Sequence, residues 1–137
     1  MNIDYRLAPE APFPDGLEDC LRAIREVLRD ESIPFDRRRV YIAGDSAGAN
    51  LVSPLRLPDG AGMYPLLIQY AEYDYLRPQI EAFIRRMRQQ GTAVEAVLYQ
   101  GLNHAFLDLF GILDQSQASV DKMNGFIQQK EAAHVSR

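Results

Sequence analysis

The sequence predicts an α/β fold with a mostly parallel sheet flanked by helices. Two observations support this fold class. Apolar runs of strand length alternate with amphipathic helical stretches along the chain, which is the order typical of parallel sheets. The chain has 137 residues, of which 47% are hydrophobic and 25% charged, an ordinary globular composition that suits one domain with one core.

The predicted N-terminal elements are a short strand, a helix and a second strand. Asn2 to Tyr5 read as a strand remnant, and a turn-rich stretch with three prolines follows. The helical spacing is carried by Leu17, Cys20, Leu21, Ile24, Val27 and Leu28. Asp15 and Glu18 suggest a capping-box-like start for this helix, and Pro34 lies beyond its end. The apolar run Val40 to Ala43 predicts a strand.

The rest of the chain predicts two more strands and two helices. The strands are Leu66 to Ala71 and Val94 to Tyr99. Between them Pro78 opens a helix and Gly91 closes it. The apolar face of that helix comprises Ile80, Phe83, Ile84 and Met87. A final helix carries Val120, Met123, Phe126 and Ile127, with Gly125 as a weakening residue in its middle.

Composition and charge exclude several functional classes. A net charge of −4 and a pI near 5.1 argue against a nucleic-acid partner, and the basic cluster Arg85, Arg86 and Arg88 is interpreted as the solvated face of a helix. The single cysteine, Cys20, allows no internal disulfide and is expected to be a small buried residue. No pattern predicts a cofactor, a metal ion, export or membrane insertion, so we expect a cytoplasmic protein.

Residues Gly44 to Gly48 form the pattern G-x-S-x-G directly after the predicted strand Val40 to Ala43. In this context the pattern indicates a nucleophile elbow, a sharp strand-to-helix turn that lifts a serine hydroxyl into the open. Small residues are expected on both sides of the serine because larger side chains would clash where the backbone doubles back. Ser46 is therefore a candidate nucleophile. The alternative is a Gly/Ser turn that only closes a strand.

An acid and a base follow the two later strands. Asp74 comes within three residues of the strand ending at Ala71, and His104 within five of the strand ending at Tyr99. Loops after parallel strands meet at one edge of the sheet, so Ser46, Asp74 and His104 should lie close together. A serine hydroxyl needs a base to take its proton, and a carboxylate to orient that base. We expect His104 to be the base, within hydrogen-bonding reach of both other residues.

Several motifs together resemble the hormone-sensitive-lipase-like branch of the α/β-hydrolases. They are Asp4-Tyr5-Arg6-Leu7-Ala8-Pro9-Glu10, Phe13-Pro14, Gly44-Asp45-Ser46-Ala47-Gly48, Glu72-Tyr73-Asp74-Tyr75-Leu76-Arg77, Tyr99-Gln100-Gly101 and His104-Ala105-Phe106. The resemblance implies a serine carboxylesterase that cleaves small or short-chain esters. By similarity, Ser46, Asp74 and His104 match the family's triad, and the backbone N–H of Ala47 matches one donor of the oxyanion hole.

The sequence also departs from the family pattern. The family's His-Gly-Gly-Gly loop, which supplies further oxyanion donors, would precede Tyr5, but Met1 lies only four residues before it. Family segments between the elbow and the acid-bearing strand are missing, with a junction near Leu51. We therefore expect a partial fold without the N-terminal strands and the cap region. It would be one domain over residues 1–137, with an elbow-bearing half (1–51) and a half bearing the acid and the histidine (52–137).

Two functional hypotheses follow. In the first, the chain hydrolyses carboxylic esters through an acyl-serine intermediate, with activity weakened by the missing oxyanion donors. In the second, it is a catalytically silent remnant or a half-domain that needs a partner chain to complete its sheet. Because strands without neighbours leave backbone groups unpaired, self-association is expected.

Overall fold

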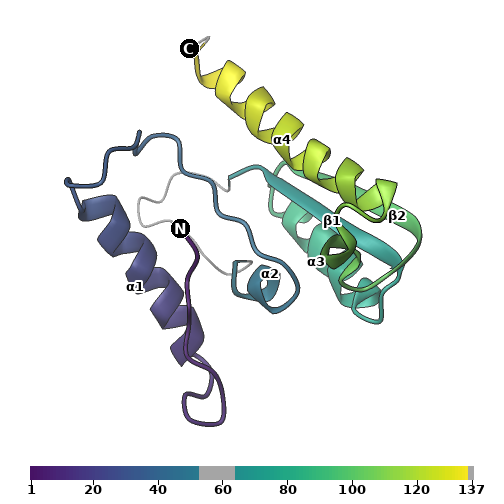
Figure 1. Ribbon diagram of the computed structural model, residues 1–137, viewed down its shortest axis with the longest axis horizontal. Coiled ribbons are helices and arrows are strands. Elements are labelled where there is room, and N and C mark those ends of the chain that lie inside the picture. The colour runs from purple at the N-terminus through teal and green to yellow at the C-terminus, as the bar shows by residue number, and fades with distance from the viewer. Residues whose placement is uncertain (53–63, 136–137) are drawn as a thin grey trace. The chain divides into compact units, whose positions relative to one another are not determined.

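The computed structural model describes residues 1–52 and 64–135, and the chain divides into two compact units (Figure 1). Unit 1 is Met1–Leu55 and unit 2 is Arg56–Arg137. Unit 1 carries two helices, whereas unit 2 carries the two strands and the remaining helices of the described residues.

Unit 1 is organised by helix α1 (Asp15–Arg29), which confirms the first predicted helix. Cys20 and Ile24 on its apolar face are buried, and burial raises the pKa of the Cys20 thiol. The predicted capping box is wrong: the residue at the N-cap is Pro14, and no side chain bonds the cap. Asp15 and Glu18 instead lie in the first turn, where negative charge is favourable because the exposed N–H groups carry partial positive charge.

The segment before α1 is held to the helix by an arginine–aspartate pair. The Arg6 guanidinium donates to both carboxylate oxygens of Asp19 at 2.8 Å, and the Arg6 backbone N–H donates to the same carboxylate at 3.2 Å. Gly16 permits this close approach, since a Cβ there would lie 3.1 Å from the Arg6 carbonyl oxygen. The predicted strand Asn2 to Tyr5 is wrong: these residues have no regular secondary structure, and the described residues of unit 1 offer no strand partner for them.

We expect Asp19→Asn to destabilise unit 1 at pH 7 and to matter less in acid. Hydrogen bonds from Arg6 hold the pKa of Asp19 well below its usual range. A depressed folded-state pKa stabilises the fold above the unfolded value of about 3.9, and that stabilisation is lost as the pH falls below it. Urea midpoints from the helical circular dichroism signal at pH 7 and pH 3 measure the effect.

The control for this pH effect is Glu26→Gln, which removes an exposed carboxylate 3.8 Å from Arg29 and should leave the midpoint nearly unchanged. An Asp19→Asn deficit as large at pH 3 as at pH 7 would contradict the expectation.

The predicted strand Val40 to Ala43 is also wrong. These residues have no regular secondary structure, and the described part of unit 1 contains no strand with which they could pair. An extended segment becomes a strand only when a neighbour supplies partners for its N–H and C=O groups. The segment leads directly into the short helix α2 (Ala47–Val52).

Unit 2 is a β–α–β unit followed by a long helix. Strand β1 (Leu66–Tyr73) and strand β2 (Val94–Asn103) pair in parallel, with Leu66 opposite Val94 and Ala71 opposite Tyr99. Both predicted strands are confirmed, and each extends beyond its predicted end. Helix α3 (Arg77–Gln89) connects them, with Pro78 in its first turn as predicted.

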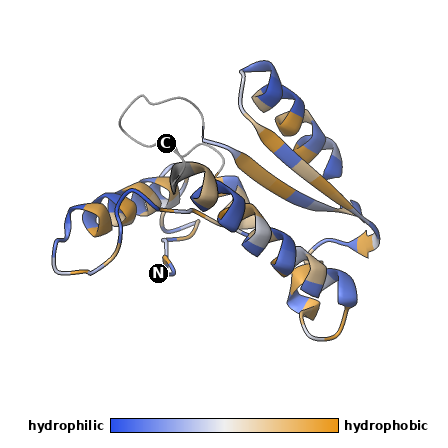
Figure 2. Cartoon of the chain, turned by 90° about the horizontal axis from the view of Figure 1, so that it is seen from above, coloured by the Kyte–Doolittle hydropathy of each residue, from blue (hydrophilic) through white to orange (hydrophobic). Residues whose placement is uncertain are grey.

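The two strands lie between α3 and α4 (Asp114–Val135), the helix that runs toward the C-terminus (Figure 2). Ala71 of β1 and Ile84 of α3 are among the most buried residues of unit 2. The basic residues Arg85, Arg86 and Arg88 are exposed on α3, as expected. The sheet flanked by helices is thus confirmed, although the described residues contain only two strands.

Partly buried polar contacts attach α4 to β1 and to the loop after β2. The Gln69 side chain on β1 donates to the carbonyl oxygen of Ser119 at 3.2 Å and accepts from the Tyr99 hydroxyl at 2.6 Å. The fully buried Ser116 hydroxyl donates to the carbonyl oxygen of Phe106 at 2.6 Å. Phe106 begins the 3₁₀ helix η1 (Phe106–Leu109), so α4 supports the loop that follows β2.

Candidate active site

The backbone at Ser46 has the geometry of a strained turn. Its φ of +49° lies in the left-handed region, which is unusual for a residue with a side chain. The chain then enters α2, with the Gly48 N–H bonded to the Asp45 carbonyl at 2.8 Å and the Asn50 N–H bonded to the Ser46 carbonyl at 3.2 Å. The turn around Ser46 therefore has the local form expected of an elbow, although the segment before it is not a strand.

The two glycines of the elbow have different roles. A Cβ on Gly44 would lie 2.4 Å from the carbonyl carbon and oxygen of Gly48, so no other residue fits without moving the backbone. A Cβ on Gly48 would meet no described atom within 4 Å. The expected steric requirement is therefore observed at Gly44 but not at Gly48.

We expect Gly44→Ala to lower the unfolding free energy of the chain by about 1–3 kcal/mol, because the new methyl group must displace backbone. Gly48→Ala is the matched control and should change the unfolding free energy by less than about 1 kcal/mol, because its methyl group meets no described atom. Urea denaturation of both variants tests this. Equal losses in the two variants would show that the close approach at Gly44 does not limit stability.

Asp74 is the first residue after β1 and forms the turn into α3. Its carboxylate oxygen Oδ1 accepts the Leu76 N–H at 2.8 Å, and its backbone carbonyl accepts the Arg77 N–H at 3.0 Å. An aspartate is suited to such a turn because its short side chain can bond the backbone two residues later. These bonds hold the carboxylate and leave its second oxygen, Oδ2, facing the end of β2.

His104 is the first residue after β2, and its ring nitrogen Nδ1 lies 2.8 Å from Oδ2 of Asp74. The Asp74 side chain is only 6% exposed and that of His104 is 25% exposed. A carboxylate can only accept, so Nδ1–H is the donor and the neutral ring carries its basic lone pair on Nε2. The predicted meeting of acid and base at one edge of the sheet is observed.

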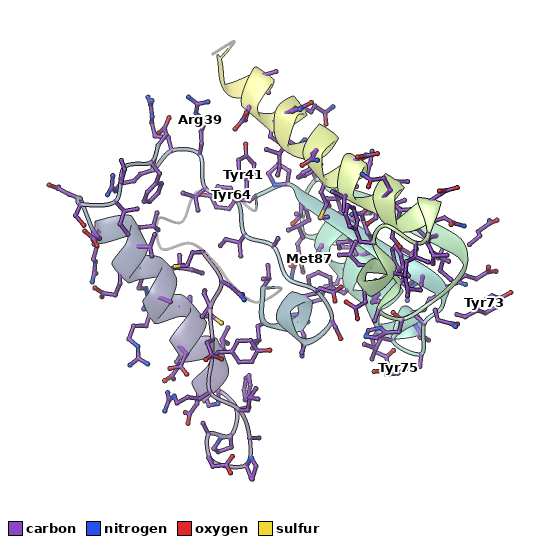
Figure 3. All side chains as sticks on the ribbon, viewed as in Figure 1. Arg39, Tyr41, Tyr64, Tyr73, Tyr75 and Met87 are labelled. Atoms are coloured by element: carbon purple, nitrogen blue, oxygen red, sulfur yellow. The ribbon has the colours of Figure 1, made fainter. Side chains whose placement is uncertain are left out.

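The aromatic ring of Tyr75 borders this pair. The Tyr75 ring lies 5.3 Å from the His104 ring at an interplanar angle of 48°. Tyr73 and Tyr75, which flank Asp74 in sequence, both point outward from unit 2 (Figure 3), and Tyr75 is 74% exposed. Behind the histidine, Ala105 has a left-handed φ of +60°, which turns the chain sharply into η1. His104 is thus presented on a tight loop beside an exposed tyrosine.

The structure also reveals residues that the sequence analysis missed. The Glu72 carboxylate accepts the Gly101 backbone N–H at 2.8 Å, which joins the ends of β1 and β2. The Tyr75–His104 contact was likewise not predicted. In the sequence, only the positions of these residues pointed to a role near the site. Glu72 lies two residues before Asp74, and Gly101 lies three residues before His104.

The structure therefore brings Asp74 and His104 together in unit 2, whereas Ser46 and Ala47 lie in unit 1. Among the described residues, no group of His, Cys, Asp and Glu side chains could hold a metal ion. No helix within residues 1–52 or 64–135 is both long and apolar enough to cross a membrane.

Comparison with known families identifies the fold. A family described as having the alpha/beta hydrolase fold matches residues 1–55 and 51–108, which together cover most of the chain. The chain belongs to this α/β-hydrolase family. The two matched stretches meet at residues 51–55, which agrees with the interruption of the family pattern that the sequence predicts near Leu51.

Known relatives of this α/β-hydrolase include esterases and lipases. The carboxylesterase NlhH of Mycobacterium tuberculosis is 39% identical over 75 residues, which are 53% of this chain and 24% of that protein. Mouse hormone-sensitive lipase is 40% identical over 76 residues, which are 47% of this chain and 10% of that protein. The resemblance to the hormone-sensitive-lipase-like branch is confirmed, and the chain matches a quarter or less of the length of these two relatives.

A solved esterase structure from Pyrobaculum calidifontis shares the fold. It superimposes with a TM-score of 0.83 at 22% sequence identity, covering 93% of this chain and 64% of that one. At this level of identity the likeness establishes the fold only. The α/β-hydrolase fold predicted from the sequence is therefore confirmed.

Proposed function

We propose that this α/β-hydrolase cleaves small carboxylic esters with Ser46 as nucleophile, His104 as general base and Asp74 as the residue that orients the base. The observation that carries the proposal is the 2.8 Å contact between Asp74 and His104 at the shared edge of the two strands. The strained φ of Ser46 supports its role, since nucleophile elbows hold their serine in such a conformation. The carboxylesterase among the relatives supports the substrate class.

The proposed reaction proceeds in two halves. Nε2 of His104 takes the proton of Ser46 Oγ as that oxygen attacks the ester carbonyl carbon, and Asp74 stabilises the resulting imidazolium. The backbone N–H of Ala47 donates to the developing oxyanion. The C–O bond to the alcohol then breaks, and His104 protonates the leaving alcohol. Water attacks the acyl-serine with His104 as base, which releases the acid and restores Ser46.

We propose that the chain is one partial α/β-hydrolase domain, because the family match includes residues of both units. The proposed substrate is a small-molecule ester, and neither a cofactor nor a nucleic acid has a part in the reaction.

Hydrolysis of p-nitrophenyl acetate by the purified chain tests the proposal. We expect a burst of p-nitrophenol of one equivalent per chain, because acylation of a serine releases the alcohol before the acyl group leaves. Mass spectrometry of the quenched protein should then find an acetyl group on the peptide that contains Ser46. Release of p-nitrophenol with the acetyl group on another residue would refute the assignment.

A second candidate function is a half-domain that is completed by another chain. The observation that favours it is the sheet of unit 2, in which β1 and β2 pair with one another and the described residues supply no third strand. Both strands therefore present an outer edge of backbone N–H and C=O groups, and such edges invite pairing with a second chain.

For this second candidate, we expect the weight-average mass in light scattering to rise with protein concentration. The physical reason is that strand addition at an open edge satisfies backbone groups and buries apolar surface. A constant monomer mass across a hundredfold concentration range, with a single cooperative melt, would instead show that the chain is self-sufficient.

A further inference from the structure

The parallel pairing of β1 and β2 is interrupted shortly before the acid and the base. Ala71 lies opposite Tyr99, but Tyr73 lies opposite Asn103, so β2 advances by four residues while β1 advances by two. The extra residues of β2 include Gly101, whose φ of +74° lies in the left-handed region. Such a bulge redirects a strand and the residues that follow it.

The side chain of Glu72 compensates for this irregularity. The Gly101 N–H cannot find its regular carbonyl partner at the bulge, and it donates instead to the Glu72 carboxylate at 2.8 Å. A hydrogen bond to a carboxylate is stronger than one to a neutral carbonyl. The contact therefore fixes the bulge of β2 against the last residues of β1.

Further contacts hold Glu72 itself in place. Its backbone carbonyl accepts from Nη1 of Arg77 at 3.3 Å, and Nε of Arg77 pairs with Glu81 at 2.8 Å on α3. Glu72 is thus linked to β2 through its side chain and to the start of α3 through its backbone. Both of these elements adjoin the loops that carry Asp74 and His104.

We propose that Glu72 is a positioning residue that sets the register between Asp74 and His104. Asp74 lies two residues after Glu72 and His104 three residues after Gly101, so the one Glu72–Gly101 bond joins the two loops at their base. Glu72 touches no reacting atom in this scheme and acts only through the histidine. The catalytic part of the inference rests on the proposed ester hydrolysis, whereas the geometric part stands independently.

The test compares Glu72→Ala with Glu72→Gln in the full chain. Glu72→Gln keeps a carbonyl oxygen that can accept the Gly101 N–H, whereas Glu72→Ala removes the acceptor. Glu95→Ala is the control, because Glu95 lies at the opposite end of the same sheet and its carboxylate pairs with Lys122 of α4 instead. Glu72→Asp, whose carboxylate is one methylene shorter, replaces Glu72→Ala if that variant does not fold.

Two readouts separate geometry from catalysis. The first is the ¹⁵N spectrum of the imidazole rings, which reports the tautomer of His104; the chain has only two histidines, and His134→Gln assigns the signals. The second is kcat and KM for p-nitrophenyl acetate. We expect Glu72→Ala to mix the His104 tautomers, to speed amide exchange at Gly101, and to lower kcat about 10- to 100-fold with little change in KM. Glu72→Gln should recover most of each loss.

Unchanged His104 tautomer and Gly101 exchange in a folded Glu72→Ala or Glu72→Asp variant would overturn the proposal. Unfolding of both variants would also overturn it, since Glu72 would then serve stability and not position. If the wild type hydrolyses no ester, the proposed function fails, but the NMR comparison still decides the role of Glu72.

Discussion

Ser46→Ala is expected to abolish covalent labelling by a fluorophosphonate probe and to lower kcat for p-nitrophenyl acetate by a factor on the order of 10⁴ to 10⁶. The probe phosphonylates a serine only when a base removes the hydroxyl proton and the hydroxyl is accessible. Ser46 combines an exposed position with the strained φ of +49°, and its variant retains a small side chain that the turn accepts. Labelling is followed by in-gel fluorescence and kcat by p-nitrophenol release.

The matched control for this labelling is Ser32→Ala. Ser32 is also an exposed serine of unit 1, but its hydroxyl donates to the Asp30 carboxylate at 2.6 Å in a loop without a histidine. We expect this variant to label and to turn over like the wild type. Labelling that survives in Ser46→Ala, or is lost in Ser32→Ala, would assign the nucleophile elsewhere.

The features predicted correctly from the sequence are those that depend on local patterns. Helix α1 follows from apolar residues at a spacing of three and four, and β1 and β2 follow from apolar runs bounded by turn residues. The Asp74–His104 contact follows from these elements, because residues after neighbouring parallel strands share one edge of the sheet.

The features that were not predicted from the sequence depend on which other segments lie next to a given segment in the folded chain. Val40 to Ala43 has the composition of a strand, but a strand also needs a hydrogen-bonded neighbour, and the described part of unit 1 contains none. Residue patterns do not contain that information. The Glu72–Gly101 contact also depends on a neighbouring strand, because it arises from a shift in register between β1 and β2. Residues that pair regularly in these two strands, such as Leu66 and Val94, are 28 positions apart in the sequence.

The elbow around Ser46 was predicted only in part. Its local form follows from the sequence, since Gly44 must accommodate the close approach of Gly48 and Ser46 has the strained φ. The strand expected before it depends on neighbours and is not formed. The short-range geometry of a site can therefore be read from a motif, whereas the sheet that carries the motif cannot.

Asp74→Asn is expected to lower kcat by about 10⁴-fold while leaving the fold largely intact. The reason lies in the two contacts of the carboxylate. Oδ1 accepts the Leu76 N–H at 2.8 Å, a role that the amide oxygen of asparagine can keep. The amide NH₂ must then occupy the position of Oδ2 and face Nδ1 of His104. Because an NH₂ group donates a hydrogen bond, Nδ1 of His104 must accept it with its lone pair, and the ring proton then lies on Nε2. A histidine protonated there cannot accept the proton of Ser46.

Three measurements on Asp74→Asn check this account. The urea midpoint should stay near that of the wild type, the ¹⁵N spectrum should show the proton of His104 on Nε2, and the p-nitrophenol burst should disappear. Asp108→Asn is the matched control, because Asp108 is an exposed aspartate in the first turn of η1, four residues after the histidine. It should leave the tautomer and the burst unchanged.

An Asp74→Asn variant that keeps the wild-type tautomer and a full burst would show that the 2.8 Å contact between Asp74 and His104 does not orient the base. Esterase chemistry, if present, would then have to rely on a different carboxylate.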